Sequence, residues 1–393
     1  MSEDGGGHTD PRSVLGPSLL TIFAALALYL PTLSHHYSAD SLLYASAIES
    51  GSWRALVHPR HPLLRPVAWL WFRWWQLLGW HGAAMVPLQT LNAVGGALCV
   101  GLVMALSARM TGSLGGATLA ATGFAVSGGV WLLSTEAEFV TVPLAVELLV
   151  LAWILRGEAS SATRLVGVGS AIAVATLMYL TNAALLPVAL LARRNGPFAG
   201  RGPAHRTVLL LTGFALPMLP ALVGAAFITG LYHWSGMFAG GNPYGIISWE
   251  NLPRGVYAFL RTLLLFPGLG MNDRTLSYLG GAPMEARAVF AVTYLAVGLT
   301  ATAPLVLAVW RGLRWPAGRE VAVWAALHAA FAFYWVPSDT SFWIPVTAAW
   351  WLLVARATAT GIVPRTMVAA LIMVLLCANA LGLILPHHFA PRG

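Results

Sequence analysis

The chain has 393 residues, of which 58% are hydrophobic and only 9% are charged. A soluble domain carries charge on about a quarter of its residues, so these proportions exclude an ordinary soluble protein. Lipid is the alternative solvent, and in lipid each helical span needs about 20 apolar residues. The apolar runs are continuous rather than alternating at every second residue, so they predict transmembrane helices and not strands.

Positive charge comes from arginine alone, because the chain contains no lysine, and the formal net charge is +8. The arginines lie in short segments between apolar runs, which is typical of positive-inside topology and of anionic lipid headgroups rather than nucleic acid. Cys99 and Cys377 both lie in apolar runs and predict neither a disulfide framework nor a metal site. Residues 1–14 lack the basic region of a signal peptide, so we expect a cytoplasmic tail before a retained first span.

Apolar length predicts about eleven membrane spans within one domain that covers residues 15–393. In chain order the spans are Leu15–Leu33, Ala83–Ser107, Leu114–Leu133, Val140–Leu155, Leu165–Tyr179, Ala183–Leu191, Val208–Leu231, Ala288–Trp310, Val321–Val336, Trp343–Val354 and Met367–Leu385. The chain ends soon after the last span, so we expect no attached soluble domain.

The apolar segment Leu63–Leu78 is long enough to resemble a further span, and the arginines decide against that. If it crossed the membrane, the basic segments around Arg109, Arg156 and Arg193–Arg206 would lie outside. We predict instead an amphipathic helix in the interface, which its four tryptophans favour. The acidic residues then collect mostly on the external face. A second, half-buried external helix is expected at Tyr257–Leu269.

The polar segment after the first span opens with Asp40, which is the best candidate for a catalytic base. A carboxylate at a partly dry interface can have its pKa raised toward the working pH, where it can accept a proton from a hydroxyl group. The alternative interpretation is structural, because aspartate is also a preferred helix N-cap and Ser41 begins a helix-like segment.

A basic cluster framed by prolines follows Asp40. Guanidinium groups grip phosphate with two parallel hydrogen bonds, and imidazole rings add further donors. The predicted donor-phosphate ligands are Arg60, Arg54, Arg65, His58 and His61. For each arginine taken alone, the alternative is contact with an ordinary lipid headgroup.

Two carboxylates, Glu136 and Glu138, follow the third predicted span. They are candidates for binding a sugar or acceptor, or for holding a divalent cation (Mg, Mn or Ca) together with Asp40, because hard cations prefer oxygen ligands. A solvated loop is the alternative. Glu147 and His328 lie inside predicted spans, where an ionisable group is either functional or a hydrogen-bonded packing residue.

The order of these residues resembles the GT-C class of membrane glycosyltransferases, which includes protein O-mannosyltransferases and aminoarabinose transferases. The motifs that carry the resemblance are Ala39-Asp40, His61-Pro62-Leu63, Glu136-Ala-Glu138, Tyr179-Leu-Thr-Asn182 and Ser338-Asp339. They are short, but they cover nearly the whole chain in order. Two features depart from the family: the loop has one acid rather than an adjacent pair, and the external C-terminal domain of many members is missing.

The resemblance implies an all-α polytopic fold with juxtamembrane helices in the first external loop. It also implies transfer of a sugar from a polyprenyl-phosphate carrier to an acceptor glycan, lipid or protein, usually with inversion. The active site would lie on the external face of a bacterial inner membrane. On this view Asp40 is catalytic, and Asn182 and Asp339 join Glu136 and Glu138 in binding the sugar or acceptor.

Two other functions remain open at this point. The chain could be a transporter or flippase for a lipid-linked precursor, or a non-catalytic membrane subunit of an envelope assembly. A transporter predicts inverted repeats and helices broken at mid-membrane, whereas here the polar residues collect at one face.

Overall fold

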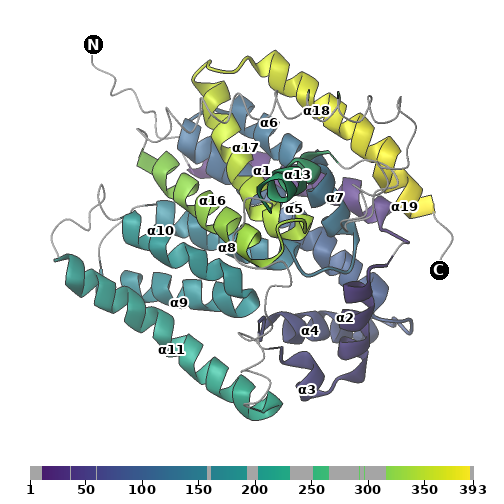
Figure 1. Cartoon of the computed structure of the whole chain (residues 1–393), viewed down its shortest axis with the longest axis vertical. Coiled ribbons are helices and arrows are strands. Elements are labelled where there is room, and N and C mark those ends of the chain that lie inside the picture. The colour runs from purple at the N-terminus through teal and green to yellow at the C-terminus, as the bar shows by residue number, and fades with distance from the viewer. Residues whose placement is uncertain are drawn as a thin grey trace. The chain divides into compact units, whose positions relative to one another are not determined.

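The computed structural model describes residues 11–35, 37–58, 60–156, 161–192, 202–230, 251–264, 292, 296 and 316–389. Within these residues the regular secondary structure is helical, and a single isolated bridge joins His58 to His61 (Figure 1). The chain forms two compact units, and each contains segments that are far apart in the sequence. The first unit comprises Met1–His36, Val100–Leu132 and Tyr244–Gly393, and the second comprises Tyr37–Cys99 and Leu133–Pro243.

The first unit contains α1 (Pro11–Tyr29), η1 (Leu30–Thr32), α6 (Leu114–Val126), α13 (Asn251–Leu263), α16 (Pro316–Trp335), η4 (Thr340–Trp343), α17 (Ile344–Ala359), α18 (Arg365–Asn379), the π-helical η5 (Ala380–Ile384) and α19 (Leu385–Phe389). The second contains α2 (Ala39–Ser50), α3 (Trp53–Leu56), α4 (Leu64–Leu77), α8 (Thr141–Leu155), α9 (Ala162–Met178), η2 (Leu180–Ala184), α10 (Leu185–Leu191) and α11 (Pro203–Thr229). Two further helices, α5 (Met85–Thr111) and α7 (Gly128–Thr135), run from one unit into the other.

Five of the described helical segments are long and apolar enough to cross a membrane, or six if one bent pair counts as a single span. The five are Ser13–Thr32, Met85–Thr111, Ala204–Thr229, Thr340–Ala359 and Arg365–Gly382. The expected count of about eleven spans is therefore not confirmed. Shorter apolar helices occupy three other predicted spans (α8, α9 and η2 with α10), and the predicted span Ala288–Trp310 lies outside the described residues.

The bent pair corrects the prediction of one continuous span over Leu114–Leu133. Here α6 and α7 meet at Ser127 with a bend of 59°. The Ser127 hydroxyl donates to the Gly123 carbonyl oxygen at 2.8 Å, and it accepts a hydrogen bond from the indole of Trp351 at 3.0 Å. A side chain on Gly123 would collide with the same indole, so glycine is needed for Trp351 to lie at the bend. A broken helix, which is one of the features that a transporter predicts, is thus present in the described residues.

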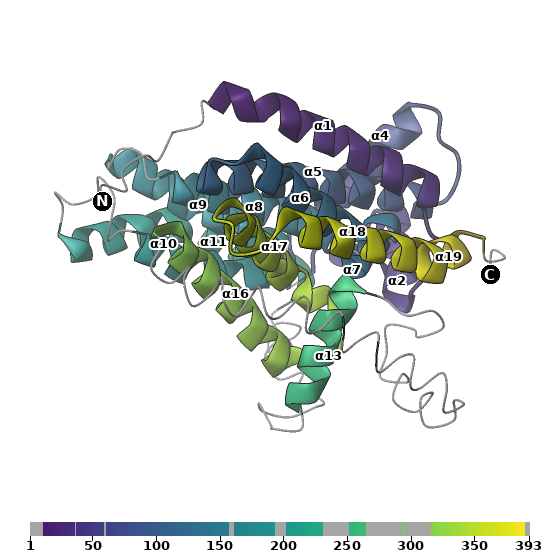
Figure 2. The ribbon, with the colours of Figure 1, turned by 90° about the horizontal axis from the view of Figure 1, so that it is seen from above.

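Contacts within the first unit show which helix ends lie together. At one end, Gly115 at the start of α6 lies against the guanidinium of Arg365 at the start of α18. At the other end, the Trp131 indole donates to the Thr32 hydroxyl at 3.0 Å, and Gly129 lies against Thr340. Figure 2 shows α17 and α18 alongside α6. The basic and non-basic ends of α1, α6, α17 and α18 therefore agree with the orientation expected from the arginines.

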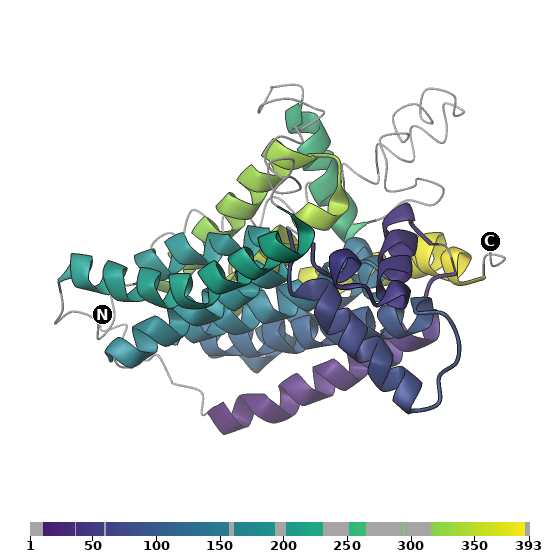
Figure 3. The same cartoon turned by 90° about the horizontal axis from the view of Figure 1, so that it is seen from below.

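The external helix expected at Tyr257–Leu269 begins earlier than predicted, at Asn251, and residues 265–269 lie outside the described part of the chain. This helix, α13, packs on α16 in the first unit (green and yellow-green in Figure 3). A side chain on Gly255 would collide with the ring of Phe333, so a small residue is required at this contact.

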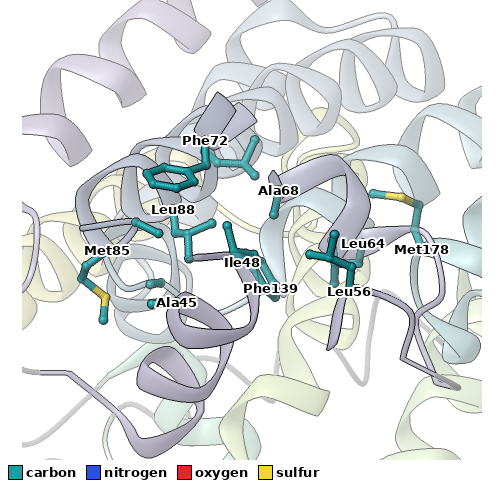
Figure 4. Packing of buried hydrophobic residues seen from close by; sticks show 13 residues of the cluster. Ala45, Ile48, Leu56, Leu64, Ala68, Phe72, Met85, Leu88, Phe139 and Met178 are labelled. Carbon is teal, nitrogen blue, oxygen red and sulfur yellow. The ribbon is translucent and has the colours of Figure 1, made fainter. Parts of the chain in front are cut away.

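The juxtamembrane helices α2, α3 and α4 share one apolar core in the second unit (Figure 4). Ile48 of α2, Leu64 of α4 and Leu88 of α5 are each fully buried there. Helix α4 has 14 residues, so it is about 21 Å long and too short for a hydrocarbon layer of about 30 Å. Its outer side exposes Leu70, Trp74 and Leu77, which fits an interfacial helix.

The most extensive helix packing in the second unit is between α9 and α11, which lie side by side in Figure 1. Two glycines bring their backbones together: a side chain on Gly169 would collide with the Leu210 carbonyl oxygen, and one on Gly213 with the Val166 carbonyl oxygen. The Ser170 hydroxyl donates to the Gly213 carbonyl oxygen at 3.0 Å. Small residues at such crossings are the usual means of close helix packing in membranes.

Candidate functional site

Helix α2 places Asp40 at the start of the candidate site without using it as a cap. Ser38 is the N-cap, because its hydroxyl accepts a hydrogen bond from the Ser41 backbone N–H at 3.0 Å. The alternative in which Asp40 caps this helix is therefore wrong. Asp40 lies in the first turn with an exposed side chain, where its negative charge is also favoured by the helix dipole.

Tyr44 lies one turn after Asp40 on the same face of α2. Its ring packs against Phe139 and, edge-on, against His61, with centroids 4.4 Å and 5.9 Å away. The Arg65 guanidinium carbon lies 5.0 Å from the centre of the same ring. Burial, followed by the negative charge of Asp40, raises the pKa of Tyr44 to about 12. The phenol therefore stays protonated at neutral pH and keeps an O–H donor.

The basic segment forms a tight turn that stacks its two histidines. The His61 backbone N–H donates to the His58 carbonyl oxygen at 3.1 Å, and the two rings stack with centroids 4.1 Å apart. The Arg60 backbone N–H donates to Nδ1 of His58 at 3.3 Å, so the neutral His58 ring carries its proton on Nε2. Burial, with Arg65 and Arg60 nearby, lowers the pKa of His58 to about 4.

His61 is the more deeply placed of the two histidines, with only 5% of its surface exposed. Burial and the neighbouring His58 hold its pKa well below the usual range, so both rings are neutral at physiological pH. Neither ring nitrogen of His61 has a hydrogen-bond partner within the described residues. A buried imidazole without hydrogen bonds costs free energy unless a ligand or water supplies them. This indicates that His61 is a binding group.

The basic turn is tied to the break after α9 by two backbone hydrogen bonds. The Leu63 N–H donates to the Leu177 carbonyl oxygen at 3.1 Å, and the Leu180 N–H donates to the Arg60 carbonyl oxygen at 3.2 Å. Asn182 holds this break, because its side-chain Nδ2 donates to the backbone carbonyl oxygens of Ala175 at 3.0 Å and Pro143 at 3.3 Å. Both donors of the amide therefore support the fold, which leaves only its oxygen for the predicted sugar contact.

The predicted phosphate-binding arginines lie in different environments. Arg65 is half-buried and donates from Nη1 to the Ala55 carbonyl oxygen at 2.8 Å, while its Nε has no hydrogen-bond partner within the described residues. Arg60 is half-buried in the basic turn itself. The Arg54 side chain is exposed on α3 and takes part in none of these contacts.

The two later acids differ sharply in exposure. Glu136 is only 3% exposed, and its Oε2 has no hydrogen-bond partner within the part of the chain that the structure describes. Burial, followed by the charge of Glu138, holds the pKa of Glu136 well above its usual range, which favours the protonated form of this carboxyl group. Glu138 is half-buried and lies close enough to Tyr44 to raise the pKa of the phenol.

The carboxylates proposed for a divalent cation are not gathered by the described structure. No group of three or more histidine, cysteine, aspartate or glutamate side chains is placed to hold a metal within the described residues. Asp40 is exposed, whereas Glu136 is buried, so the two side chains lie in different environments. A cation held by Asp40 with one of the two glutamates therefore stays a prediction, and the proposed reaction does not depend on it.

The remaining sequence candidates are all buried or capping groups. Asp339, in the first unit, accepts a hydrogen bond from the Ser341 N–H at 2.9 Å and so caps η4. Glu147 in α8 and His328 in α16 are 1% and 2% exposed, as expected for polar groups enclosed by neighbouring helices.

Sequence reasoning missed two residues. Tyr44 was detectable from its four-residue spacing after Asp40, which places both side chains on one helix face. Arg261 in α13 is only 2% exposed, beside the Tyr257 ring, and a buried guanidinium on an amphipathic helix is a functional signal that only burial reveals.

Comparisons with family models and with curated proteins find no match for this chain. Among solved structures, ArnT from Cupriavidus metallidurans with bound undecaprenyl phosphate aligns over 94% of this chain, with TM-score 0.61 and 17% identity. The apo state of the same protein aligns over 88% of this chain and 60% of its own length, with TM-score 0.57 and 16% identity. An oligosaccharyltransferase from Archaeoglobus fulgidus, solved with an acceptor peptide, covers 94% of this chain and 55% of its own, with TM-score 0.46 and 13% identity.

The chain spans 64% of the length of the undecaprenyl phosphate-bound ArnT, so the alignment omits about a third of that protein. At these identities the likeness concerns the fold, which extends over nearly all of this chain. The protein is therefore an integral membrane protein with the GT-C fold of membrane glycosyltransferases.

Proposed function

We propose that this chain is a glycosyltransferase that moves a sugar from a polyprenyl-phosphate donor to an acceptor at the external face of the membrane. The observation that carries the proposal is the group formed by Asp40, Tyr44, His61 and Arg65. It joins an acid, a protonated phenol, a guanidinium and an imidazole whose nitrogens have no hydrogen-bond partner within the described residues. The likeness to ArnT, which was solved with undecaprenyl phosphate, supports a polyprenyl phosphate as the lipid.

Negative charge develops on the lipid phosphate as the sugar leaves, and the basic turn is suited to stabilise it. Arg60 and Arg65 supply permanent positive charge, and the free Nε of Arg65 offers a further donor. His58 and His61 are neutral at physiological pH, so they contribute N–H donors rather than charge. Groups fixed in advance by packing and backbone ties lose little freedom when the charge appears.

Asp40 is proposed as the general base. It accepts the proton of the acceptor hydroxyl while that oxygen bonds to the anomeric carbon and the carbon–phosphate-oxygen bond breaks. One such displacement inverts the anomeric configuration and needs no second nucleophile. The Tyr44 O–H can donate to a sugar or phosphate oxygen beside the base, and the protonated Glu136 can donate to a sugar hydroxyl. Glu138 is proposed to accept from the sugar or acceptor.

Purified protein supplied with radiolabelled polyprenyl-phosphate sugars tests the proposal. Transfer of label to a water-soluble or lipid acceptor supports it. Movement of intact donor between leaflets without transfer would support a flippase. If neither transfer nor movement is observed, the result would support a non-catalytic subunit. Arg60→Lys keeps the charge but loses the bidentate fork, so it should raise KM for the donor. Arg73→Lys is the control, because Arg73 is exposed on α4, where it donates to Gln76 and lies over the Trp69 ring.

The external position of the site has its own test. In a variant without Cys99 and Cys377, a single cysteine at Ser52 or Gly82 should react with an impermeant thiol reagent added outside, and one at Ser113 should not. Ser52 and Gly82 are both exposed, and they lie before α3 and after α4 in the sequence. Labelling of Gly82 from the cytoplasm alone would contradict the external site. A divalent cation held by Asp40 also stays a prediction, and full transfer activity after treatment with EDTA would contradict it.

A further inference from the structure

Two histidines from opposite ends of the sequence meet in the first unit. His35 follows η1, and His388 lies in α19, the last described helix. Their ring centroids are 5.0 Å apart with an angle of 31° between the ring planes. Both side chains are half-buried, so solvent and small ions can reach them. Neither residue belongs to the donor site proposed above, which lies in the second unit.

The tautomer of His388 is fixed by its surroundings. Its Nδ1 lies 2.9 Å from the Leu33 carbonyl oxygen, and since a carbonyl can only accept, Nδ1 must carry the proton. The neutral ring therefore presents the lone pair of Nε2. Phe389 packs edge-on against the same ring, with centroids 5.0 Å apart, and limits its rotation. A histidine whose second nitrogen donates to a backbone carbonyl is the arrangement that orients metal-binding imidazoles in proteins.

The separation of the two rings also suits a shared cation. A zinc–nitrogen bond of about 2.1 Å places the metal about 3.2 Å from each imidazole centroid, and a tetrahedral angle then separates the centroids by about 5.2 Å. The observed 5.0 Å is close to this value. Direct stacking of two uncharged rings, without a metal, is the alternative explanation of the same contact.

We propose that His35 and His388 bind one divalent cation of the imidazole-preferring class, such as Zn²⁺, Ni²⁺ or Cu²⁺, with water completing the coordination. No third histidine, cysteine or acid is placed at this pair within the described residues, so binding is weaker than in a structural zinc site and exchangeable. The cation links the segment after the first span to α19. It would stabilise the folded protein in proportion to its concentration.

The test uses the full chain in detergent after removal of metals with EDTA. Titration with ZnCl₂ by calorimetry should show saturable binding of one ion per chain, and MgCl₂ should show none. Co²⁺ should give the visible absorption of a nitrogen-ligated ion. His35→Ala and His388→Asn should each weaken zinc binding at least about ten-fold. His81→Ala, which removes an exposed histidine from the loop before α5, should bind as the wild type does.

Thermal unfolding without metal separates the two explanations of the contact. The proposal predicts that EDTA-treated wild type and both variants melt at similar temperatures, and that added Zn²⁺ raises only the wild-type value. If both variants lower the melting temperature in EDTA and Zn²⁺ does not bind the wild type, the rings only stack and the proposal is wrong. Zinc binding with unchanged affinity in both variants would also overturn it. No readout depends on sugar transfer, so failure of the proposed enzyme activity leaves this test intact.

Discussion

The replacement Asp40→Asn separates catalysis from folding at the start of α2. Asparagine has nearly the same shape but cannot accept the hydroxyl proton, so turnover should fall by about 10²–10⁴-fold. That loss corresponds to a rise of about 3–5 kcal/mol in the activation barrier. Because Ser38 and not Asp40 caps the helix, the folding cost comes from lost charge interactions, with the nearby Arg65 and with the helix dipole. The interaction with the dipole is worth about 0.3–1 kcal/mol.

Ser38→Ala is the complementary variant. It removes the acceptor for the Ser41 N–H and should lower the free energy of unfolding by about 1 kcal/mol, while catalysis is retained at temperatures where the protein is folded. Initial rates of sugar transfer and melting temperatures, measured on the same preparations, give both quantities. Donor binding should survive Asp40→Asn, since the proposed phosphate ligands lie in the basic turn.

A second carboxylate on the same helix provides the matched control. Glu49 accepts a hydrogen bond from the Ala84 N–H at 2.7 Å, a role that glutamine can also fill, so Glu49→Gln should remain active. A fully active Asp40→Asn protein would refute the assignment of Asp40 as base. Equal destabilisation by Asp40→Asn and Ser38→Ala would refute the capping argument instead.

Three further outcomes are expected. Gly169→Ala should destabilise the protein by about 1–3 kcal/mol, because the added methyl group meets the Leu210 carbonyl oxygen. Gly224→Ala in α11, where nothing lies within 4 Å of the added methyl group, should be neutral or slightly stabilising. Equal melting temperatures of the two variants would contradict this prediction. The pKa of His58 is depressed to about 4 from 6.5, so the folded protein resists protonation of this ring. The free energy of unfolding should therefore fall as the pH is lowered from 6.5 toward 4. His58→Gln should flatten the dependence of melting temperature on pH in this range. Arg65→Lys should raise KM for the donor about ten-fold or more, since lysine lacks the planar fork, and an unchanged KM would remove Arg65 from the phosphate site.

Several features of this protein follow from the sequence because they depend on local composition. Apolar length predicted the positions of α1, α5, α11, α17 and α18, since lipid demands a continuous run of about 20 such residues. Arginine placement predicted that Leu63–Leu78 is interfacial, and the 14-residue length of α4 is consistent with that prediction. The order of Asp40 and the basic turn indicated the GT-C fold, which the likeness to ArnT confirms.

Other features were decided by contacts between segments that are remote in the chain. The sequence Ser127-Gly128-Gly129 is a local helix-breaking signal, but the hydrogen bond that Ser127 accepts at the break comes from Trp351, 224 residues later. The raised pKa of Glu136 and the lowered pKa of His61 both result mainly from burial. The meeting of His35 and His388 joins residues 353 positions apart in sequence number (388 minus 35). Sequence reports the length and polarity of each segment, but which polar groups lose water, and which partners replace it, is settled only when distant helices pack together.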